Sequence, residues 1–363
     1  MAAARARPEG SVRVLFATTR GAGHFGPLVP FARACARAGH DVIVAAPASA
    51  AVLAARAGLP HRAVGEAPTE LVEDVLWRRS TSPEEVIRDV FVGLHARTAL
   101  PGMREAIAAW RPDVVVRESM ELASVVAAAE HGVPVVRVGI RLDSATDSTG
   151  WLEELAAPAI GVEVERLRQG PLLTRSPGPA ESGVHRFRTD VPRRRDPELV
   201  YVTFGSEAPG SPHFPGVYRR AIEALEEFPV LLTIGDRRDP AELGPLPPNV
   251  RLERWVSQPE VMPRALAMVS HGGSGSTLMA LAAGVPQAFV PLFVDGPANA
   301  RRVAELGAGI VAEDDLAGAV RALLADPGYA LAAARVADEI AALPPVEDAV
   351  GVIQRSAAGQ AIR

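Results

Sequence analysis

A chain of 363 residues is long enough for two α/β domains that each bury a core of their own. Hydrophobic residues make up 48% of the chain and charged residues 22%, the balance of an ordinary globular protein, and the net charge of −5 argues against a nucleic-acid partner. All 38 basic residues are arginines, which excludes lysine-dependent phosphate loops, Schiff-base enzymes and kinase chemistry.

Strands and helices alternate through the first half of the chain, a pattern typical of a parallel sheet. Residues 1–11 are basic but lack the apolar stretch of a signal peptide, so we expect a flexible tail. Residues 66–111 are expected to form mostly polar helices that line a cleft. The pattern predicts strands at 12–17, 41–46, 59–64, 113–117, 133–140 and 171–174, and helices at 27–37, 121–131 and 152–169. These elements predict an N-terminal domain over 12–175.

Residues 176–197 contain many prolines, glycines and arginines and few apolar residues, which is typical of a linker. The alternation then starts again and predicts a second α/β domain over 198–328. Its expected strands lie at 199–204, 230–234, 250–253 and 287–293, with a helix near 217–227. The last segment, 329–363, is expected to hold two helices separated by two prolines. Because the second sheet does not need them, we expect these helices to cross back and brace the first domain.

The segment HGGSGST at 271–277 places three glycines in five positions just before an apolar helix. Glycines let backbone N–H groups approach a ligand closely, and the helix N-terminus adds roughly half a positive charge. His271 offers a further donor, so the turn suits an anion such as a phosphate. A plain strand-to-helix turn with tightly packed glycines is also compatible with the pattern. Ligands bind at the carboxyl ends of parallel strands, so this turn and Asp295 should share one rim.

Two residues at strand ends in the first half suit acid–base chemistry. His24 follows the first expected strand, and an imidazole there can act as a general base at neutral pH. Glu118 ends the strand at 113–117, and a carboxylate beside an imidazole fixes its tautomer and stabilises its charged form. Each has a simpler alternative: His24 as a cap of the following helix, and Glu118 as a salt-bridge partner of an arginine.

Trp255 follows the strand at 250–253, where an exposed ring offers a stacking surface for a nucleobase, although a packed core position is the alternative. The other histidines lack metal-ligand spacing, and Asp314 with Asp315 is typical of a helix N-cap, so we expect no metal site. The single cysteine, Cys35, indicates a reducing compartment. With no run long enough to span a membrane, we expect a cytoplasmic protein.

Five motifs in a fixed order carry a family resemblance: VRVLFATTRGAGHFGPLVPFARACARAGHDV, PDVVVRESMELASVVAAAEHGVPVV, LVYVTFGS, RWVSQPEVMP and HGGSGST. Together they resemble the family 1 glycosyltransferases of the GT-B fold, and in particular bacterial enzymes that attach activated sugars to natural products. The resemblance covers residues 12–356. It implies two Rossmann-like domains, an acceptor bound by the first and a nucleotide diphosphate-sugar bound by the second, with no cofactor and a monomer or homodimer as the active form.

The resemblance also implies roles for single residues. By position, His24 matches the catalytic base, Glu118 the acid that orients it, and Asp295 the acid that holds sugar hydroxyls. The residues that match the nucleotide and diphosphate site are Ser206, Trp255, Val256, Gln258, His271, Gly273, Ser276 and Thr277. The implied reaction is an inverting displacement in which the nucleotide diphosphate leaves without help from a metal ion.

Two positions depart from the family pattern. Gly296 follows Asp295 where the family commonly has glutamine, which removes a donor and an acceptor for sugar hydroxyls. Met279 stands where many relatives carry a glutamate that binds ribose hydroxyls, and an apolar residue there favours a deoxyribose. We therefore expect a TDP-sugar rather than a UDP-sugar, and a deoxygenated one. The alternatives are a non-catalytic helper protein of the same fold, which Gly296 favours, and a nucleotide-sugar epimerase.

Overall fold

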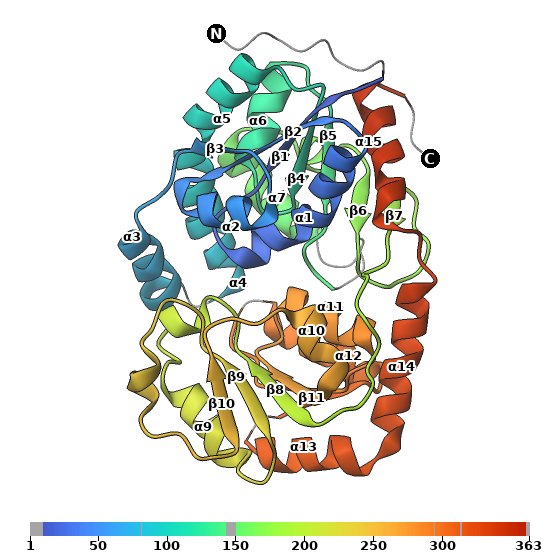
Figure 1. Cartoon of the computed structure of the whole chain (residues 1–363). Coiled ribbons are helices and arrows are strands. Elements are labelled where there is room, and N and C mark those ends of the chain that lie inside the picture. The colour runs from blue at the N-terminus through green and yellow to red at the C-terminus, as the bar shows by residue number, and fades with distance from the viewer. Residues whose placement is uncertain (1–9, 81, 143–149, 294, 313, 361–363) are drawn as a thin grey trace.

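The computed structural model describes residues 10–80, 82–142, 150–293, 295–312 and 314–360. Two α/β halves face one another, the first in blue to green and the second in yellow to orange (Figure 1). Each half is built on one sheet, of seven strands in the first and six in the second, and every strand pairing is parallel. This confirms the predicted α/β fold. Almost all of the expected tail at 1–11 lies outside the described residues.

The first sheet has the strand order β3-β2-β1-β4-β5-β6-β7. Its central strands are mostly apolar because helices cover both faces, and β4 is buried along its whole length, including its last two residues, Arg117 and Glu118. The bounds are β1 Arg13–Ala17, β2 Asp41–Pro47, β3 His61–Val64, β4 Val114–Glu118, β5 Val135–Val138, β6 Leu172–Thr174 and β7 Val184–Arg186.

The segment expected as a linker, 176–197, is not irregular throughout. It contains β7, which pairs in parallel with β6, Leu172 lying opposite Val184. A strand of three residues at the edge of a sheet has one neighbour and little apolar character, so neither length nor periodicity reveals it in the sequence. The first sheet therefore extends beyond residue 175.

Helices cover the first sheet, and π-helical turns (η2, η3) interrupt the region 66–111. The bounds are α1 Ala22–Arg37, η1 Ala48–Ala50, α2 Ala51–Ala57, α3 Thr69–Asp74, η2 Val75–Arg79, α4 Pro83–Glu85, η3 Val86–Ala96, α5 Arg97–Trp110, α6 Ala123–Glu130, α7 Gly150–Ile160 and α8 Val164–Arg168. The first helix begins five residues before the expected start at 27, so His24 lies in its first turn. The glycines and prolines there have low helix propensity, which packing against the sheet overrides.

The second sheet has the order β10-β9-β8-β11-β12-β13. The central strand β11 and the edge strand β13 were not predicted, and β12 ends at Phe289 rather than at 293. The bounds are β8 Leu199–Thr203, η4 Ala208–Gly210, α9 Gly216–Ala224, β9 Val230–Thr233, η5 Pro240–Leu243, β10 Val250–Glu253, α10 Gln258–Val261, η6 Met262–Arg264, β11 Ala265–Ser270, α11 Ser274–Ala283, β12 Gln287–Phe289, α12 Gly296–Glu305, β13 Gly309–Val311 and α13 Leu316–Ala325.

Two C-terminal helices run along one side of both halves (Figure 1). The first, α14 (Pro327–Ala341), packs on α11 of the second half. After Pro344 and Pro345 and the short turn η7 (Val346–Asp348), α15 (Ala349–Ala357) packs on α1, β4 and β5. Its apolar side chains join the core cluster of the first sheet. In the described part of the chain, no helix has the length and apolar character needed to cross a membrane.

Candidate active site

Each sheet has one point where the strand order reverses: between β1 and β4 in the first and between β8 and β11 in the second. Connections leave these strands toward opposite faces, which opens a crevice at their carboxyl ends. His24 follows β1 and Glu118 ends β4, while Ser206 follows β8 and His271 follows β11. The residues singled out in the sequence therefore gather at the two crevices.

The imidazole of His24 contacts the carboxylate of Glu118. Nδ1 of His24 lies 3.2 Å from Oε1 of Glu118, an ion-pair contact without the alignment of a hydrogen bond. The histidine side chain is 21% exposed and the carboxylate is fully buried. The alternative role of His24 as a helix cap does not hold, because α1 has no side-chain cap. One face of the imidazole also lies near Phe91, with ring centroids 5.3 Å apart.

Glu118 is held in place by backbone and side-chain donors. Oε1 accepts hydrogen bonds from the backbone N–H (3.3 Å) and the hydroxyl (3.1 Å) of Thr19, and Oε2 accepts one from the N–H of Met120 at 2.6 Å. Burial alone would raise the pKa of Glu118, but the charge of His24 and these hydrogen bonds lower it below its ordinary value. The carboxylate is therefore ionised and fixed beside the imidazole at neutral pH.

The charges around His24 come from both halves of the molecule. Burial alone would lower the pKa of His24, but the charge of Glu118 raises it, and Asp295 and Glu207 of the second half add to this effect. His95 of η3 also lies nearby, and burial lowers its pKa to about 4, so it is neutral. The net result is a pKa of His24 above its ordinary value. The carboxylates of the second half thus act on a base held by the first.

The glycine-rich turn leads from β11 into α11. Gly272 has a positive φ of 85°, and the N-cap residue Gly273 offers no side chain to the first N–H groups of the helix. Asn299 of α12 braces the turn by donating to the carbonyl of Gly272 at 2.7 Å and to the hydroxyl of Ser274 at 3.0 Å. Asn299 thus holds the turn in place, and the uncapped N–H groups at the start of α11 have the geometry that suits an anion.

Asp295 is attached to the same turn. Its Oδ2 accepts hydrogen bonds from the hydroxyl of Ser274 (3.1 Å) and the side-chain amide of Asn299 (3.2 Å). Asn299 is a residue of this site that the sequence did not single out. Its signal was a polar side chain on the inner face of an amphipathic helix, where α12 buries it. Asp295 and the glycine-rich turn therefore share one rim, as predicted.

His271 is packed between two glycines. A methyl group at Gly205 would lie 2.7 Å from Cε1 of the imidazole, and one at Gly273 would lie 2.3 Å from Nε2. The opposite neighbour is Phe293, whose ring centroid lies 5.4 Å away. Burial lowers the pKa of His271, so the ring is neutral at pH 7 and carries one N–H donor. Larger residues at either glycine would push this donor out of place.

Gly296 fits closely against the same turn. A methyl group there would lie 2.5 Å from the backbone carbonyl of His271, a contact that only a backbone shift can relieve. We expect Gly296→Ala to lower the free energy of unfolding by about 1–3 kcal/mol, as overpacked sites do. Urea unfolding measures this loss. Gly275→Ala is the matched control in α11, because nothing lies within 4 Å of the added methyl group. Equal stability of both variants and the parent would contradict the expectation.

The remaining predicted residues surround α10 and the start of α11. Gln258 donates to the hydroxyl of Ser276 at 2.8 Å, and the hydroxyl of Thr277 donates to the carbonyl of Gly273 at 2.9 Å. Trp255 is 69% exposed, so the alternative of a packed core residue is wrong. Val256 packs at the edge of a core cluster, and Ser206 is exposed in the turn after β8.

Helical turns of the region 66–111 contact the second half. Arg237, in the loop after β9, forms ion pairs with Glu73 of α3 and with Glu207. Trp77 of η2 faces Phe293, with ring centroids 5.5 Å apart. These contacts join α3 and η2 to the second half. In the described part of the chain, no group of three or more histidine, cysteine or acidic side chains has the arrangement of a metal site.

Two domain families match this chain. "Erythromycin biosynthesis protein CIII-like, N-terminal domain" matches residues 33–159, and the corresponding C-terminal domain matches residues 221–355. The elloramycin glycosyltransferase ElmGT of Streptomyces olivaceus is 34% identical over 93% of this chain and 95% of that protein. The L-demethylnoviosyl transferase of Streptomyces niveus is 33% identical over 95% of this chain and 99% of that protein.

Solved structures share the fold. The glycosyltransferase SnogD of Streptomyces nogalater superimposes with a TM-score of 0.76 and 28% identity, covering 96% of this chain and 99% of that chain. SsfS6 of Streptomyces sp. SF2575, complexed with thymidine diphosphate, gives a TM-score of 0.76 and 25% identity over 95% of this chain and 99% of that chain. The glycosyltransferase VinC in complex with dTDP superimposes with a TM-score of 0.72 and 26% identity, covering 96% of this chain and 100% of that chain.

Proposed function

Because the chain belongs to the erythromycin biosynthesis protein CIII-like family of GT-B glycosyltransferases, we propose a specific donor, acceptor class and catalytic base for it. The enzyme transfers a sugar from a nucleotide-sugar donor to a natural product, as this family of bacterial antibiotic glycosyltransferases does. The proposed donor is a TDP-deoxysugar, the proposed acceptor is hydrophobic, and the proposed transfer is an inverting displacement without a metal ion.

The His24–Glu118 pair is the observation that carries this proposal. Glu118 is buried with Oε1 3.2 Å from Nδ1 of a half-buried imidazole, which favours the tautomer with the proton on Nδ1 and leaves Nε2 to accept a proton. Asp295 and Glu207 of the second half act on the same imidazole. The base is thus close to the half that is proposed to bind the donor.

The proposed reaction is a single displacement. Nε2 of His24 takes the proton of the acceptor hydroxyl while the acceptor oxygen attacks the anomeric carbon of the sugar. The bond from that carbon to the phosphate oxygen breaks, and the nucleoside diphosphate leaves with its electron pair. Glu118 stabilises the imidazolium that forms, which is the role of the orienting acid in such relays.

Negative charge grows on the leaving diphosphate, and the turn before α11 is suited to stabilise it. The first N–H groups of α11 have no side-chain cap, and the buried imidazole of His271 lies beside them. Fixed donors of this kind need no reorganisation during the reaction, so they stabilise the transition state strongly.

The acceptor is proposed to be hydrophobic because apolar side chains surround the base. Phe91 lies against His24 and belongs to a small apolar cluster with Ile87 and Met120. Burial of an apolar surface there stabilises a bound acceptor by about 25 cal/mol per Å². Contacts with these uncharged side chains would position the acceptor so that its hydroxyl faces the imidazole of His24.

The donor base is proposed to be thymine. Trp255 offers an exposed ring for stacking, and the apolar Met279 favours a deoxyribose. Two structural relatives are complexes with thymidine diphosphate. A thermal-shift panel with TDP, UDP, GDP and ADP tests this: TDP should raise the melting temperature most. Stabilisation by a purine diphosphate alone would contradict the assignment.

A helper protein of the same fold and a nucleotide-sugar epimerase are the competing functions. A helper needs no base, whereas burying Glu118 beside an imidazole costs desolvation energy that the charge of His24 and the hydrogen bonds of Thr19 and Met120 must offset. An epimerase would change the sugar of the donor without consuming an acceptor. Chromatography after incubation with a TDP-deoxysugar and an acceptor distinguishes the three functions. Only a transferase joins the sugar to the acceptor, an epimerase changes the donor alone, and a helper changes neither.

The pH dependence follows from the raised pKa of His24. A general base must be neutral, so kcat/KM should fall as the pH drops through a midpoint above the ordinary value of 6.5. Glu118→Gln removes the carboxylate that raises the pKa of His24 most, so the acid limb of the kcat/KM profile should move to lower pH. We also expect kcat to fall by roughly 10–100-fold, because the imidazole loses its orienting partner. An unmoved acid limb would show that a different group titrates.

A further inference from the structure

Arg117 is a buried charge one residue before Glu118. It lies in β4, and its side chain is 2% exposed. Burial, and then the charge of Arg137, lower the pKa of this guanidinium to about 10, so it is still protonated at neutral pH. Taking such a charge out of water is costly unless hydrogen bonds satisfy its donors. The carbonyls that accept hydrogen bonds from Arg117 therefore show which part of the chain its guanidinium holds in place.

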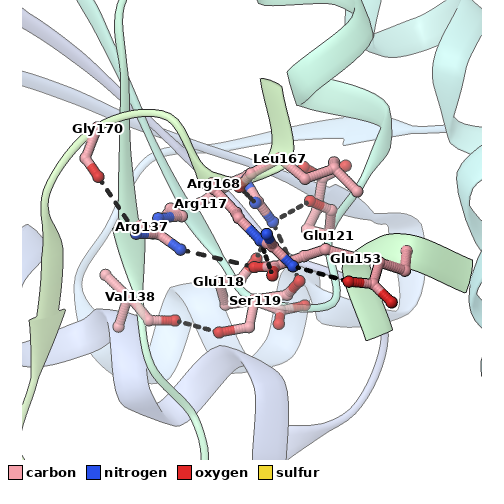
Figure 2. A network of polar contacts seen from close by, with 11 residues as sticks. Arg117, Glu118, Ser119, Glu121, Arg137, Val138, Glu153, Leu167, Arg168 and Gly170 are labelled. Atoms are coloured by element: carbon pink, nitrogen blue, oxygen red, sulfur yellow. Dashed lines mark hydrogen bonds and ion pairs between the residues drawn. The ribbon is translucent and has the colours of Figure 1, made fainter. Parts of the chain in front are cut away.

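The guanidinium of Arg117 donates hydrogen bonds to backbone carbonyls of the turn that follows β4 (Figure 2). Nη1 donates to the carbonyls of Glu118 at 3.2 Å, Ser119 at 3.0 Å and Glu121 at 3.2 Å. Nη2 donates to the carbonyl of Leu167 in α8 at 2.8 Å. The planar fork thus joins the turn at 118–121 to a helix almost fifty residues further along the chain, a geometry that suits arginine.

The same turn positions the carboxylate of Glu118. The N–H of Met120, between two carbonyls that Arg117 binds, donates to Oε2 at 2.6 Å. Ser124 donates its N–H to both oxygens of Glu121, which anchors the far end of the turn to α6. A shift of the turn would move the Met120 N–H, and the carboxylate would turn away from His24 with it.

We propose that Arg117 is a positioning residue for the His24–Glu118 pair: it holds the turn at 118–121 so that the carboxylate of Glu118 faces Nδ1 of His24. Its value for the reaction rests on the proposed function, in which His24 is the base. The geometric claim, that Arg117 keeps Glu118 against His24, does not need turnover and is tested separately. Arg117 touches neither donor nor acceptor in this proposal.

Arg137 is a matched control. It lies opposite Arg117 in the pairing of β4 with β5, and it is also largely buried. Its partners lie away from the turn: Nη1 is 3.6 Å from Glu153, and Nη2 donates to the carbonyl of Gly170 at 3.4 Å (Figure 2). Arg137→Gln should therefore lower stability without disturbing Glu118.

The test compares Arg117→Lys, Arg117→Gln and Arg137→Gln by NMR titration of the His24 imidazole, without substrate. Lysine keeps the charge but cannot reach the turn and Leu167 together, so a lower pKa of His24 reports a displaced Glu118. In Arg117→Gln the loss of a nearby cation would by itself raise the pKa of His24. A lower pKa of His24 in this variant would therefore also indicate that Glu118 is displaced. The other titratable and charged groups near His24, which are Arg20, His95, Glu207 and Asp295, are unchanged in all three variants.

Activity gives the second readout. We expect kcat to fall by roughly 10–100-fold in Arg117→Gln, less in Arg117→Lys, and hardly in Arg137→Gln, with TDP affinity within about twofold throughout. The acid limb of the pH profile should follow the pKa of His24. If one Arg117 variant does not fold, the other gives the answer. If neither folds, while Arg137→Gln does, the role of Arg117 is structural and the proposal fails.

Two outcomes separate this proposal from the proposed function. A lower melting temperature with an unchanged pKa of His24 and an unchanged pH profile would overturn the positioning role of Arg117. A shifted pKa of His24 with no glycosyl transfer by the parent enzyme would instead leave Arg117 as the residue that positions Glu118 and remove the proposed reaction.

Discussion

Replacing His24 with alanine is expected to lower kcat by roughly 10²–10⁴-fold, the usual scale for the loss of a general base. The reason is that the variant lacks the imidazole that takes the proton of the acceptor hydroxyl. The neighbouring imidazole of His95 is a weak base, because burial lowers its pKa to about 4. TDP binding should stay within about twofold, because the turn before α11 belongs to the other half. Steady-state kinetics and calorimetric titration with TDP measure the two quantities.

A second histidine provides the control for this variant. His131 is an exposed residue after α6, and its Nδ1 contacts only the carbonyl of Ala127 among the hydrogen bonds described for it. His131→Ala should keep the turnover of the parent enzyme. Unchanged turnover in His24→Ala would remove this residue from the mechanism, and a joint loss of turnover and TDP binding would indicate a folding defect instead.

Replacing Trp255 with alanine is expected to weaken TDP binding by about 1–3 kcal/mol, the usual contribution of base stacking on an aromatic ring. Because the ring is 69% exposed, its removal leaves no cavity in the core, and the melting temperature without nucleotide should not change. Calorimetric titration gives the affinity, and thermal unfolding gives the stability. Trp255→Phe keeps an aromatic face and should recover part of the lost affinity.

Leu331→Ala is the matched control for exposure. Leu331 lies on α14 and is 68% exposed, so its truncation removes a similar exposed apolar side chain at a distance from the donor half's crevice. We expect no change in TDP affinity. If Trp255→Ala binds TDP as tightly as Leu331→Ala, the ring does not stack on the base, and the nucleotide site has to be placed elsewhere.

The predicted positions of His24, Glu118 and His271 follow from a local rule. Each residue lies at or beyond the carboxyl end of an apolar strand: Glu118 ends its strand, His271 follows directly, and His24 follows after a short glycine-containing turn. Parallel strands place their carboxyl ends on one edge of a sheet. The sequence therefore predicts which side chains share a rim without knowledge of the strand order. It could not predict that β1 and β4 are neighbours at the reversal of strand order, because that depends on pairing between residues far apart in the chain.

Residues that act through backbone contacts cannot be singled out from the sequence. Arg117 lies at the end of the predicted strand at 113–117 without any sign of its role, and nothing in the sequence singles out Asn299. An arginine in a strand carries no sign that its guanidinium binds carbonyls of its own turn and of α8. The short edge strand β7 and the early start of α1 were missed for a related reason, since packing against the sheet decides both.

The amino-acid sequence by itself determined the alternation of strands and helices, the two sheets and the identity of the side chains at their carboxyl edges. These depend on apolar runs and glycine positions, which are local properties of the chain. Only the tertiary structure decided that Glu118 is buried against His24 and that Gly296 lies close to the carbonyl of His271. It also decided that Arg117 joins the turn at 118–121 to α8. Burial and hydrogen bonding across long sequence separations set these contacts, and no local pattern encodes them.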